Sequence, residues 1–204
     1  MSRAVEPAVE SSDAELVAAA RAGDREAFGV LVDRHQRRVV AVAAGIAGDY
    51  HDAEDLAQEA FVRAFRSLDT LRDSGRFAPW VGGIAAHVAL DWVRGRRGRP
   101  VPRQDLPEPP FEPGLPERLD PPAAEAELAL VREIALGLPE DLRVVLTLRA
   151  VQALPYAEIA EALGIEESQV KGRLHRARAE LRRRLGRYRV AHGGHALPRP
   201  GEGH

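Results

Sequence analysis

A cluster of prolines near the middle of the chain restricts its fold more than any other feature. Nine of the fifteen prolines lie between Pro100 and Pro122, among acidic residues and glycine, and this segment has no apolar periodicity. Proline removes a backbone donor and fixes φ, so neither a helix nor a central strand continues through such a run. The composition is typical of an extended linker, which would span roughly 70 Å at about 3.1 Å per residue. We therefore expect two loosely tethered domains on either side of residues 100–122.

The sequence after the linker predicts a helix-turn-helix. Residues 155–184 read PYAEIAEALGIEESQVKGRLHRARAELRRR, a short amphipathic segment, a glycine and a long basic segment. Pro155 suits a first helical turn because its missing N–H has no partner there, and Gly164 suits a corner that needs a positive φ. The second helix, from Glu167 or Ser168, is predicted to bury residues spaced four, three and four apart: Val170, Leu174, Ala177 and Leu181.

Positive charge is concentrated on this second helix. The whole chain has a net charge of −2, whereas residues 167–189 carry nine basic and two acidic side chains, a local charge of +7. A basic helix that follows a tight corner fits the major groove of DNA and contacts with phosphates. The alternative is a solvated charged helix at the end of a bundle.

Four helices are predicted before the linker, within residues 13–99. The first ends at Gly23, and Asp24 can cap the second. The third covers residues 51–68, and a polar loop at 69–76 leads to the fourth. The apolar stripes of the last three helices contain Phe28, Leu31, Val32, His35, Val39 and Val42; Leu56, Ala60, Phe61, Ala64, Phe65 and Leu68; and Phe77, Trp80, Val81, Ile84, Val88 and Trp92. After the linker, helices at 123–136 and from 139 complete a four-helix domain at 123–186.

Composition excludes several classes of protein. The absence of cysteine excludes disulfides, cysteine-ligated zinc and a thiol nucleophile, and no apolar run is long enough to cross a bilayer. Residues 1–12 lack the features of a secretory signal. We therefore expect a cytoplasmic protein without membrane insertion, with flexible ends at 1–12 and 187–204. No phosphate loop, nucleophile arrangement or metal-ligand set occurs, so no enzymatic activity, metal or cofactor is predicted, and His35 or a His51–Asp55 pair is not expected to bind metal.

Four sequence blocks resemble a known family. They are DAELVAAARAGDREAF, DAEDLAQEAFVRAF, FAPWVGGIAAHVALDWVRGRR and, after the linker, LPEDLRVVLTLRAVQALPYAEIAEALGIEESQVKGRLHRARAELRRRL. In content and order they closely resemble the extracytoplasmic-function (ECF) sigma factors of the sigma-70 family, over nearly all of residues 13–185. The resemblance implies an all-α fold, with a region 2 helical bundle and a region 4 helix-turn-helix domain joined by a flexible proline-rich linker.

The resemblance implies a subunit that binds core RNA polymerase and directs it to promoters. The family's main surface for the clamp helices of the largest polymerase subunit corresponds to Asp52, Asp55, Gln58, Glu59 and Arg63. The earlier helices of region 4 would sit on the polymerase flap. The polymerase supplies the chemistry, so no catalytic residue is expected. An anti-sigma factor is a further partner implied by the family.

Two groups of residues are implied to contact promoter DNA. The loop at 71–76 and the helix after it resemble the part that captures a base flipped from the −10 element and helps to open the duplex. The expected −10 contacts are Arg76, Phe77, Trp80, His87, Arg94 and Arg97. The expected −35 contacts on the second helix of the helix-turn-helix are Ser168, Gln169, Lys171, Arg173, His175, Arg176 and Arg178. Aromatic stacking on unpaired bases is one reading of Phe77 and Trp80, and core packing is the other.

The chain departs from the family pattern at three positions. His87 stands where an asparagine is common, Gly83 where an arginine is common, and Gly172 where a serine is common in the VKSR segment. The −10 and −35 sequences therefore do not follow from the resemblance. Two other functions remain open: a stand-alone helix-turn-helix regulator, for which residues 13–99 offer no ligand motif, and a polymerase adaptor, for which the basic helix would have no use.

Overall fold

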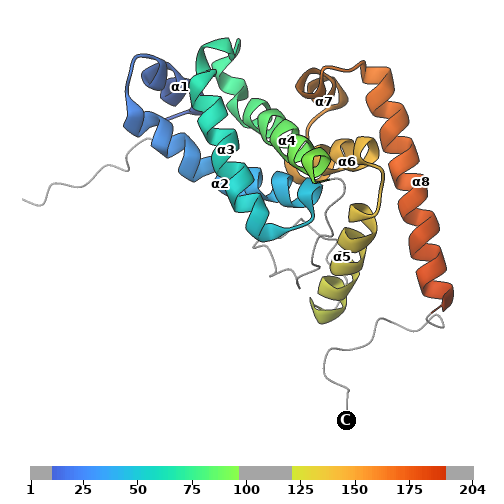
Figure 1. Ribbon diagram of the computed structural model, residues 1–204. Coiled ribbons are helices and arrows are strands. Elements are labelled where there is room, and N and C mark those ends of the chain that lie inside the picture. Colours follow the sequence, from blue (N-terminus) through green and yellow to red (C-terminus); the bar gives the residue numbers. More distant parts are fainter. Residues whose placement is uncertain (1–10, 97–120, 192–204) are drawn as a thin grey trace, which may run out of the picture.

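The computed structural model describes residues 11–96 and 121–191, in which all regular secondary structure is helical (Figure 1). Most of the predicted N-terminal arm, of the proline-rich linker and of the C-terminal tail lies outside these residues. The all-α prediction is confirmed.

The first half of the chain forms a bundle of α1 (Asp13–Arg21), α2 (Arg25–Ala47), α3 (Tyr50–Arg66) and α4 (Phe77–Gly95). Local sequence explains where these helices begin. Ser12 and Glu15 form a capping box on α1, and the carboxylates of Asp24 and Asp49 accept backbone N–H bonds at the starts of α2 and α3. Two 3₁₀ turns, η1 (Leu68–Thr70) and η2 (Ser74–Arg76), connect α3 to α4.

Two phenylalanines differ in their agreement with helical periodicity, because Phe65 lies outside the core that periodicity predicts for it and Phe77 lies inside its predicted stripe. Phe65 was expected in the buried stripe of α3 but is 44% exposed, and its ring meets that of Phe28 edge to face at 4.9 Å. Phe77 was expected to contact DNA but is 0% exposed, because Phe28, His35 and Trp80 surround it at the start of α4. A buried ring cannot stack on a base, so Phe77 is a core residue.

The second half contains α5 (Pro121–Leu136), α6 (Glu140–Gln152), α7 (Tyr156–Leu163) and α8 (Glu167–Ala191). Helix α5 begins ahead of the expected Ala123, and α8 continues past the expected end at residue 186. Gly164 adopts the left-handed conformation, with φ of 63°, at the corner between α7 and α8. Val170, Leu174 and Ala177 are buried on α8 as predicted, whereas Leu181 is half-buried.

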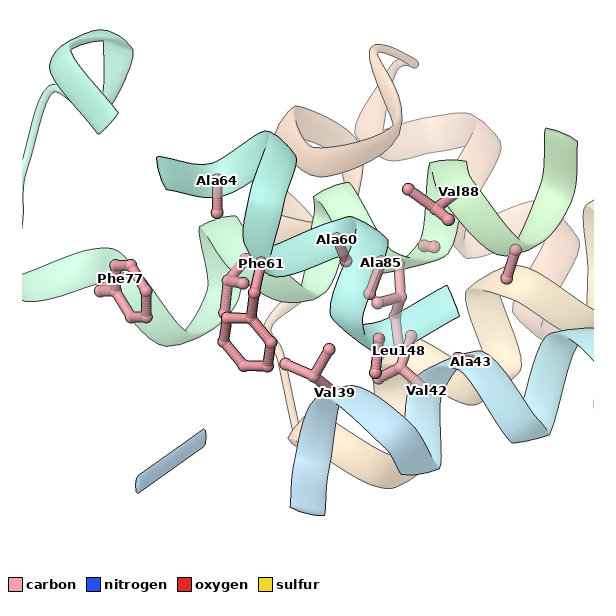
Figure 2. Packing of buried hydrophobic residues seen from close by; sticks show 14 of the residues in the cluster. Val39, Val42, Ala43, Ala60, Phe61, Ala64, Phe77, Ala85, Val88 and Leu148 are labelled. Atoms are coloured by element: carbon pink, nitrogen blue, oxygen red, sulfur yellow. The ribbon is translucent and has the colours of Figure 1, made fainter. Parts of the chain in front are cut away.

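The two halves are packed against each other, which differs from the loose tethering that the linker suggested. Helix α6 lies between α8 and the face formed by α2 and α4, and α7 packs on α4. Val145, Leu148 and Ile159, each 0% exposed, belong to the same hydrophobic cluster as the core of the first bundle. Figure 2 shows Leu148 within the cluster that includes Val39 and Val42 of α2 and Ala85 of α4.

Candidate nucleic-acid and partner interfaces

The exposed side of α3 carries a polar surface, which we call the α3 face and define by Asp55, Gln58, Glu59 and Arg63. All four side chains are exposed, and Nε of Arg63 donates to Oε1 of Glu59 at 2.8 Å. Asp52, expected in the same set, is half-buried instead, and its carboxylate accepts a 2.8 Å bond from Nη1 of Arg96. Asp52 therefore links α3 to the end of α4.

An apolar patch adjoins the α3 face. Val62 and Phe65, 42% and 44% exposed, lie over Phe28, and the arginines Arg25 and Arg66 border them. Exposed aromatic surface beside charged groups is typical of protein interfaces. Sequence periodicity missed this patch because it assigned Phe65 to the core.

A cavity of about 350 Å³ lies beside the first half of α4, and we call it the α4 pocket. Its α4 side is formed by Trp80, Gly83, Ile84 and His87, and Leu71 and Arg76 contribute from the preceding loop and turn. The structure thus brings together three of the predicted −10 residues: Arg76, Trp80 and His87. The opposite wall comes from α7, through Glu158, Glu161 and Ala162.

Arg76 and His87, at the α4 pocket, each have local partners, although none of these contacts is made by the buried Nε of Arg76. Arg76 contacts two α7 carboxylates, with Nη1 at 2.9 Å from Oε2 of Glu161 and Nη2 at 3.4 Å from Oε1 of Glu158. His87 is exposed, and its Nδ1 lies 2.9 Å from the carbonyl oxygen of Gly83, one turn earlier. Its other ring nitrogen is therefore the one left to meet a ligand.

Arg94, another predicted −10 cation, lies near the end of α4. Nε of Arg94 is 3.6 Å from Oε2 of Glu140, at the start of α6. Arg97 lies outside the described residues, so its prediction has no structural counterpart here. Arg96, which is not among the predicted −10 contacts, places its guanidinium 4.2 Å from the ring centre of Trp92.

The start of α8 presents the predicted −35 residues on an open surface. Ser168, Gln169, Lys171, His175, Arg176 and Arg178 are exposed. Arg173 is more covered, at 24% side-chain exposure, and its Nε lies 3.8 Å from Asp141. The amide oxygen of Gln169 accepts the backbone N–H of Glu166 at 3.0 Å, so this side chain caps the helix. A side chain at Gly172 would meet open space.

In the second half of α8, charged side chains form hydrogen bonds with one another. Nε of Arg184 donates to Oε1 of Glu180 at 2.7 Å, and Arg183 donates to both oxygens of the same carboxylate. These hydrogen bonds, first that from Arg183, lower the pKa of Glu180 to about 2. Charge at this end of α8 is therefore partly neutralised within the helix, whereas Arg173 and Arg176 lie 3.8 Å and 4.0 Å from the carboxylate of Asp141 on α6.

Within residues 11–96 and 121–191 no group of His, Asp and Glu side chains has the arrangement of a metal site. No helix in these same segments is sufficiently long and apolar to cross a membrane.

Comparison with protein families identifies both halves of the chain. A family model described as Sigma-70 region 2 matches residues 31–99, and a second, described as Sigma-70, region 4, matches residues 128–181. The first match contains the α3 face and the α4 side of the α4 pocket. The second contains α6, α7 and the exposed start of α8.

Curated relatives agree with these matches. The ECF RNA polymerase sigma factor SigE of Mycolicibacterium smegmatis is 37% identical over 78% of this chain. The ECF RNA polymerase sigma-E factor of Escherichia coli strain K12 is 33% identical over 83% of this chain and 92% of its own length. The chain spans 61% of the length of the Mycolicibacterium protein and 42% of that of a probable sigma factor, RfaY, from Xanthomonas campestris pv. campestris.

Two solved structures share this fold. CnrH, solved in complex with the cytosolic domain of CnrY, has a TM-score of 0.64 and 30% identity, covering 86% of this chain and 98% of CnrH. RpoE from Bartonella quintana, solved with the anti-sigma factor NepR, shares the fold at a TM-score of 0.59 and 20% identity, covering 78% of this chain and 96% of RpoE. Both sigma-70 regions are matched in order, and the Escherichia coli relative is matched over 92% of its length. This chain therefore belongs to the ECF sigma factors of the sigma-70 family, which are transcription initiation factors and not enzymes.

Proposed function

We propose that this chain binds core RNA polymerase through the α3 face and directs it to promoters whose −10 and −35 elements are read by the α4 pocket and by α8. One observation carries the proposal: each matched region has an exposed polar surface. Region 2 has the α3 face, which suits a protein partner, and region 4 has the basic start of α8, which suits DNA. The surfaces lie on different helices, so one chain can engage polymerase and DNA together.

The α3 face is the proposed contact for the clamp helices of the largest polymerase subunit. Asp55, Gln58 and Glu59 project from a helix whose opposite side is fully buried, so their positions are fixed by the core. The apolar patch at Val62 and Phe65 adds desolvated contact area beside these charges. Asp52 belongs to the family motif, but we assign it a positioning role, because Arg96 holds its carboxylate.

The α4 pocket is the proposed site for an unpaired base of the −10 element. Taking a base out of the stack costs a few kcal/mol, and stacking on an aromatic side chain contributes about 1–3 kcal/mol per base. Trp80 and His87 supply the ring surface and a polar edge, and Arg76 and Arg94 supply positive charge for the strand. Duplex opening is then driven by binding that only the open strand can make.

The exposed start of α8 is the proposed reader of the −35 element. Lys171, His175 and Arg176 lie on the open side of the helix, where base edges and phosphates of the major groove are within reach. Arg173 is more covered and lies near Asp141, so it is less accessible to DNA than Lys171, His175 and Arg176. The absence of a side chain at Gly172 leaves the backbone free to approach the duplex closely.

An anti-sigma factor is the proposed regulator. One fold neighbour, RpoE, was solved with the anti-sigma factor NepR, and CnrH was solved with the cytosolic domain of CnrY. These partners belong to those proteins, and they support the expectation that this chain too is held by a protein until a signal releases it.

In vitro transcription with core polymerase and a random promoter library tests the proposal. We expect transcripts that depend on the chain and that share two elements upstream of their start sites. A matched sample with Glu59→Arg should lose most of these transcripts. Tight, specific binding of the chain alone to duplex DNA, with no transcripts from core polymerase, would instead indicate a stand-alone helix-turn-helix regulator.

A further inference from the structure

We infer that Arg21, the last residue of α1, is a positioning residue for −10 recognition: it holds in place the loop that forms one side of the α4 pocket. The inference rests on the proposed function of the α4 pocket and adds a residue that sharpens the pocket's choice of base. Arg21 does not itself line the pocket, so it acts through the loop.

The guanidinium of Arg21 binds the backbone between α3 and α4. Its Nη2 lies 2.9 Å from the carbonyl oxygen of Leu68 and also donates to that of Leu71, and its Nε lies 3.3 Å from the Leu68 oxygen. Its Nη1 lies 3.4 Å from the hydroxyl of Ser74, in η2. These acceptors are 47, 50 and 53 residues away in the sequence. One planar side chain therefore contacts both turns of the loop.

Each of the two turns is closed by its own backbone hydrogen bond. The N–H of Leu71 donates to the carbonyl oxygen of Leu68 at 3.2 Å, and the N–H of Arg76 donates to that of Asp73 at 2.9 Å. The side chains of Leu68 and Leu71 are buried and anchor the first turn to the core. Because Arg21 contacts the first turn and Ser74 in the second, it links the two.

The linked turns form one wall of the α4 pocket. The loop and its second turn supply these lining residues: Thr70, Leu71, Arg72, Asp73 and Arg76. The ring-bearing residues Trp80 and His87 lie on the regular helix α4, so the loop is the side of the pocket whose position depends most on outside support. A wall that is ordered before binding lowers the entropy cost of binding a base. A wall with a single position also disfavours bases that do not fit it.

The corner after α1 fixes the direction of Arg21. Gly23 has a φ of 103°, which a residue with a Cβ rarely adopts. The backbone N–H of Asp24 donates to the carbonyl oxygen of Ala19 at 3.1 Å, and the Asp24 side chain caps α2. The side chain of Arg21 therefore extends towards the loop from a backbone held at both ends.

Two roles that depend on charge alone predict different results from this one. A cation at the end of a helix interacts favourably with the helix dipole, and an exposed cation attracts DNA phosphates. Lysine serves in either role. The contacts of Arg21 need the planar, forked guanidinium, which lysine lacks. Asp69 adds little, because it lies 4.0 Å from Nε and its side chain is 93% exposed.

Transcription from the random promoter library, with core polymerase and Arg21→Ala, tests the inference. At one −10 position we expect the ratio of the favoured base to the next most frequent base to fall at least fivefold, with an unchanged −35 element. This ratio does not depend on how much of the variant is folded, so a loss of stability alone would leave it unchanged. Arg21→Lys should lose base preference like Arg21→Ala. Arg37→Ala, which removes an exposed arginine of α2, should match the wild type.

Amide hydrogen exchange measures the loop directly. The amides of residues 70–76 should exchange at least fivefold faster in Arg21→Ala than in the wild type, whereas the buried parts of α2 and α3 should keep their protection. Unchanged exchange in the loop would contradict the positioning role. An equal increase throughout the bundle would show that Arg21 contributes only to stability.

The salt dependence of binding separates positioning from a phosphate contact. The polymerase complex is titrated with a single-stranded oligonucleotide that carries the non-template −10 sequence of a selected promoter. Arg21→Ala should lower the affinity and leave the slope of log K against log salt concentration unchanged. A slope shallower by about 0.7 would show that Arg21 contacts a phosphate, and would overturn the inference.

The library experiment distinguishes failure of this inference from failure of the proposed function. Wild-type base preference in Arg21→Ala, or its full recovery in Arg21→Lys, would overturn the role of Arg21 and leave the proposed function intact. If the wild type directs no transcription with core polymerase, the proposed function fails, and the role of Arg21 fails with it.

Discussion

Asp52 and Arg96 form an ion pair that joins the first turn of α3 to the end of α4, with Oδ2 and Nη1 2.8 Å apart. Both side chains are partly covered, at 25% and 37% exposure. A pair of this kind contributes about 0.5–1 kcal/mol. Asp52→Asn should therefore lower the free energy of unfolding by about that amount, measured by urea denaturation. An unchanged unfolding curve together with a loss of polymerase affinity would show that Asp52 acts as a contact instead.

Charge reversal on the α3 face should weaken polymerase binding without weakening the fold. For Glu59→Arg we expect at least a tenfold lower affinity for core polymerase, because an exposed carboxylate at the proposed interface becomes a cation. Glu54→Arg is the matched control: it makes the same change on the same helix, roughly 140° around its axis. Pull-down or fluorescence titration measures the affinity. Equal effects of the two variants would argue for a general response to charge.

Arg176 is proposed to meet DNA directly at the start of α8. Its side chain is 64% exposed and lies 4.0 Å from Asp141, an exposed pair that contributes little to stability. Arg176→Ala should therefore leave the fold nearly unchanged and cost about 1–3 kcal/mol of −35 binding if Arg176 contacts a base. Arg187→Ala removes the same charge roughly 16 Å further along the helix and serves as the control. Promoter binding by the polymerase complex measures both. An equal loss of promoter binding in the control would show that Arg176 contributes only through the overall positive charge of α8.

His87 is the predicted determinant of −10 preference in the α4 pocket. His87→Asn keeps a polar side chain but removes the ring, so we expect the base composition at one −10 position to change while the −35 element stays the same. Sequencing of transcripts from the promoter library reads both elements in one experiment. Identical promoter profiles for the variant and the wild type would show that His87 has no part in base recognition.

Glu180 gives a pH dependence of defined sign. Hydrogen bonds from Arg183 and Arg184 lower its pKa from 4.5 to about 2 in the folded chain. A lowered carboxylate pKa stabilises the fold above the unfolded pKa, and this contribution is lost as pH falls from about 4.5 towards 2. The difference in Tm between the wild type and Glu180→Gln should be constant above about pH 5 and should shrink below it. A difference that grows on acidification would contradict the assignment.

Local rules accounted for the helices and their ends. Asp24 and Gly164 occur where a cap and a left-handed corner are needed, so both were predictable from residue type. The exposed set on α8 followed from its apolar stripe at Val170, Leu174 and Ala177. The polar residues of the α3 face are exposed for the same reason. Asp52, predicted with them, is half-buried because its partner Arg96 lies 44 residues away in the sequence.

The packing of the two halves was not predictable from such rules. Helical periodicity marks one apolar side of α6, but Val144 and Thr147 are also buried, since α6 contacts the first bundle as well as α8. Gly45 and Gly82 appear in the sequence as ordinary helical glycines, and only their partners in the other half explain them. Phe65 was misplaced because periodicity cannot identify which side of a helix meets a third element, whereas Phe77 is buried in the stripe that periodicity predicts.

The shared core affects the concentration at which the chain binds a promoter. When only a molecule with separated halves can bind a promoter, the apparent dissociation constant is the intrinsic value divided by the fraction of molecules whose halves are separated. Each ~1.4 kcal/mol of packing free energy that holds Val145, Leu148 and Ile159 against the first bundle then raises the concentration of chain needed for half-maximal promoter binding about tenfold. One buried methylene, at ~0.8 kcal/mol, would change it about fourfold. Side chains that never touch DNA would thereby set the threshold at which the promoters of this sigma factor become active.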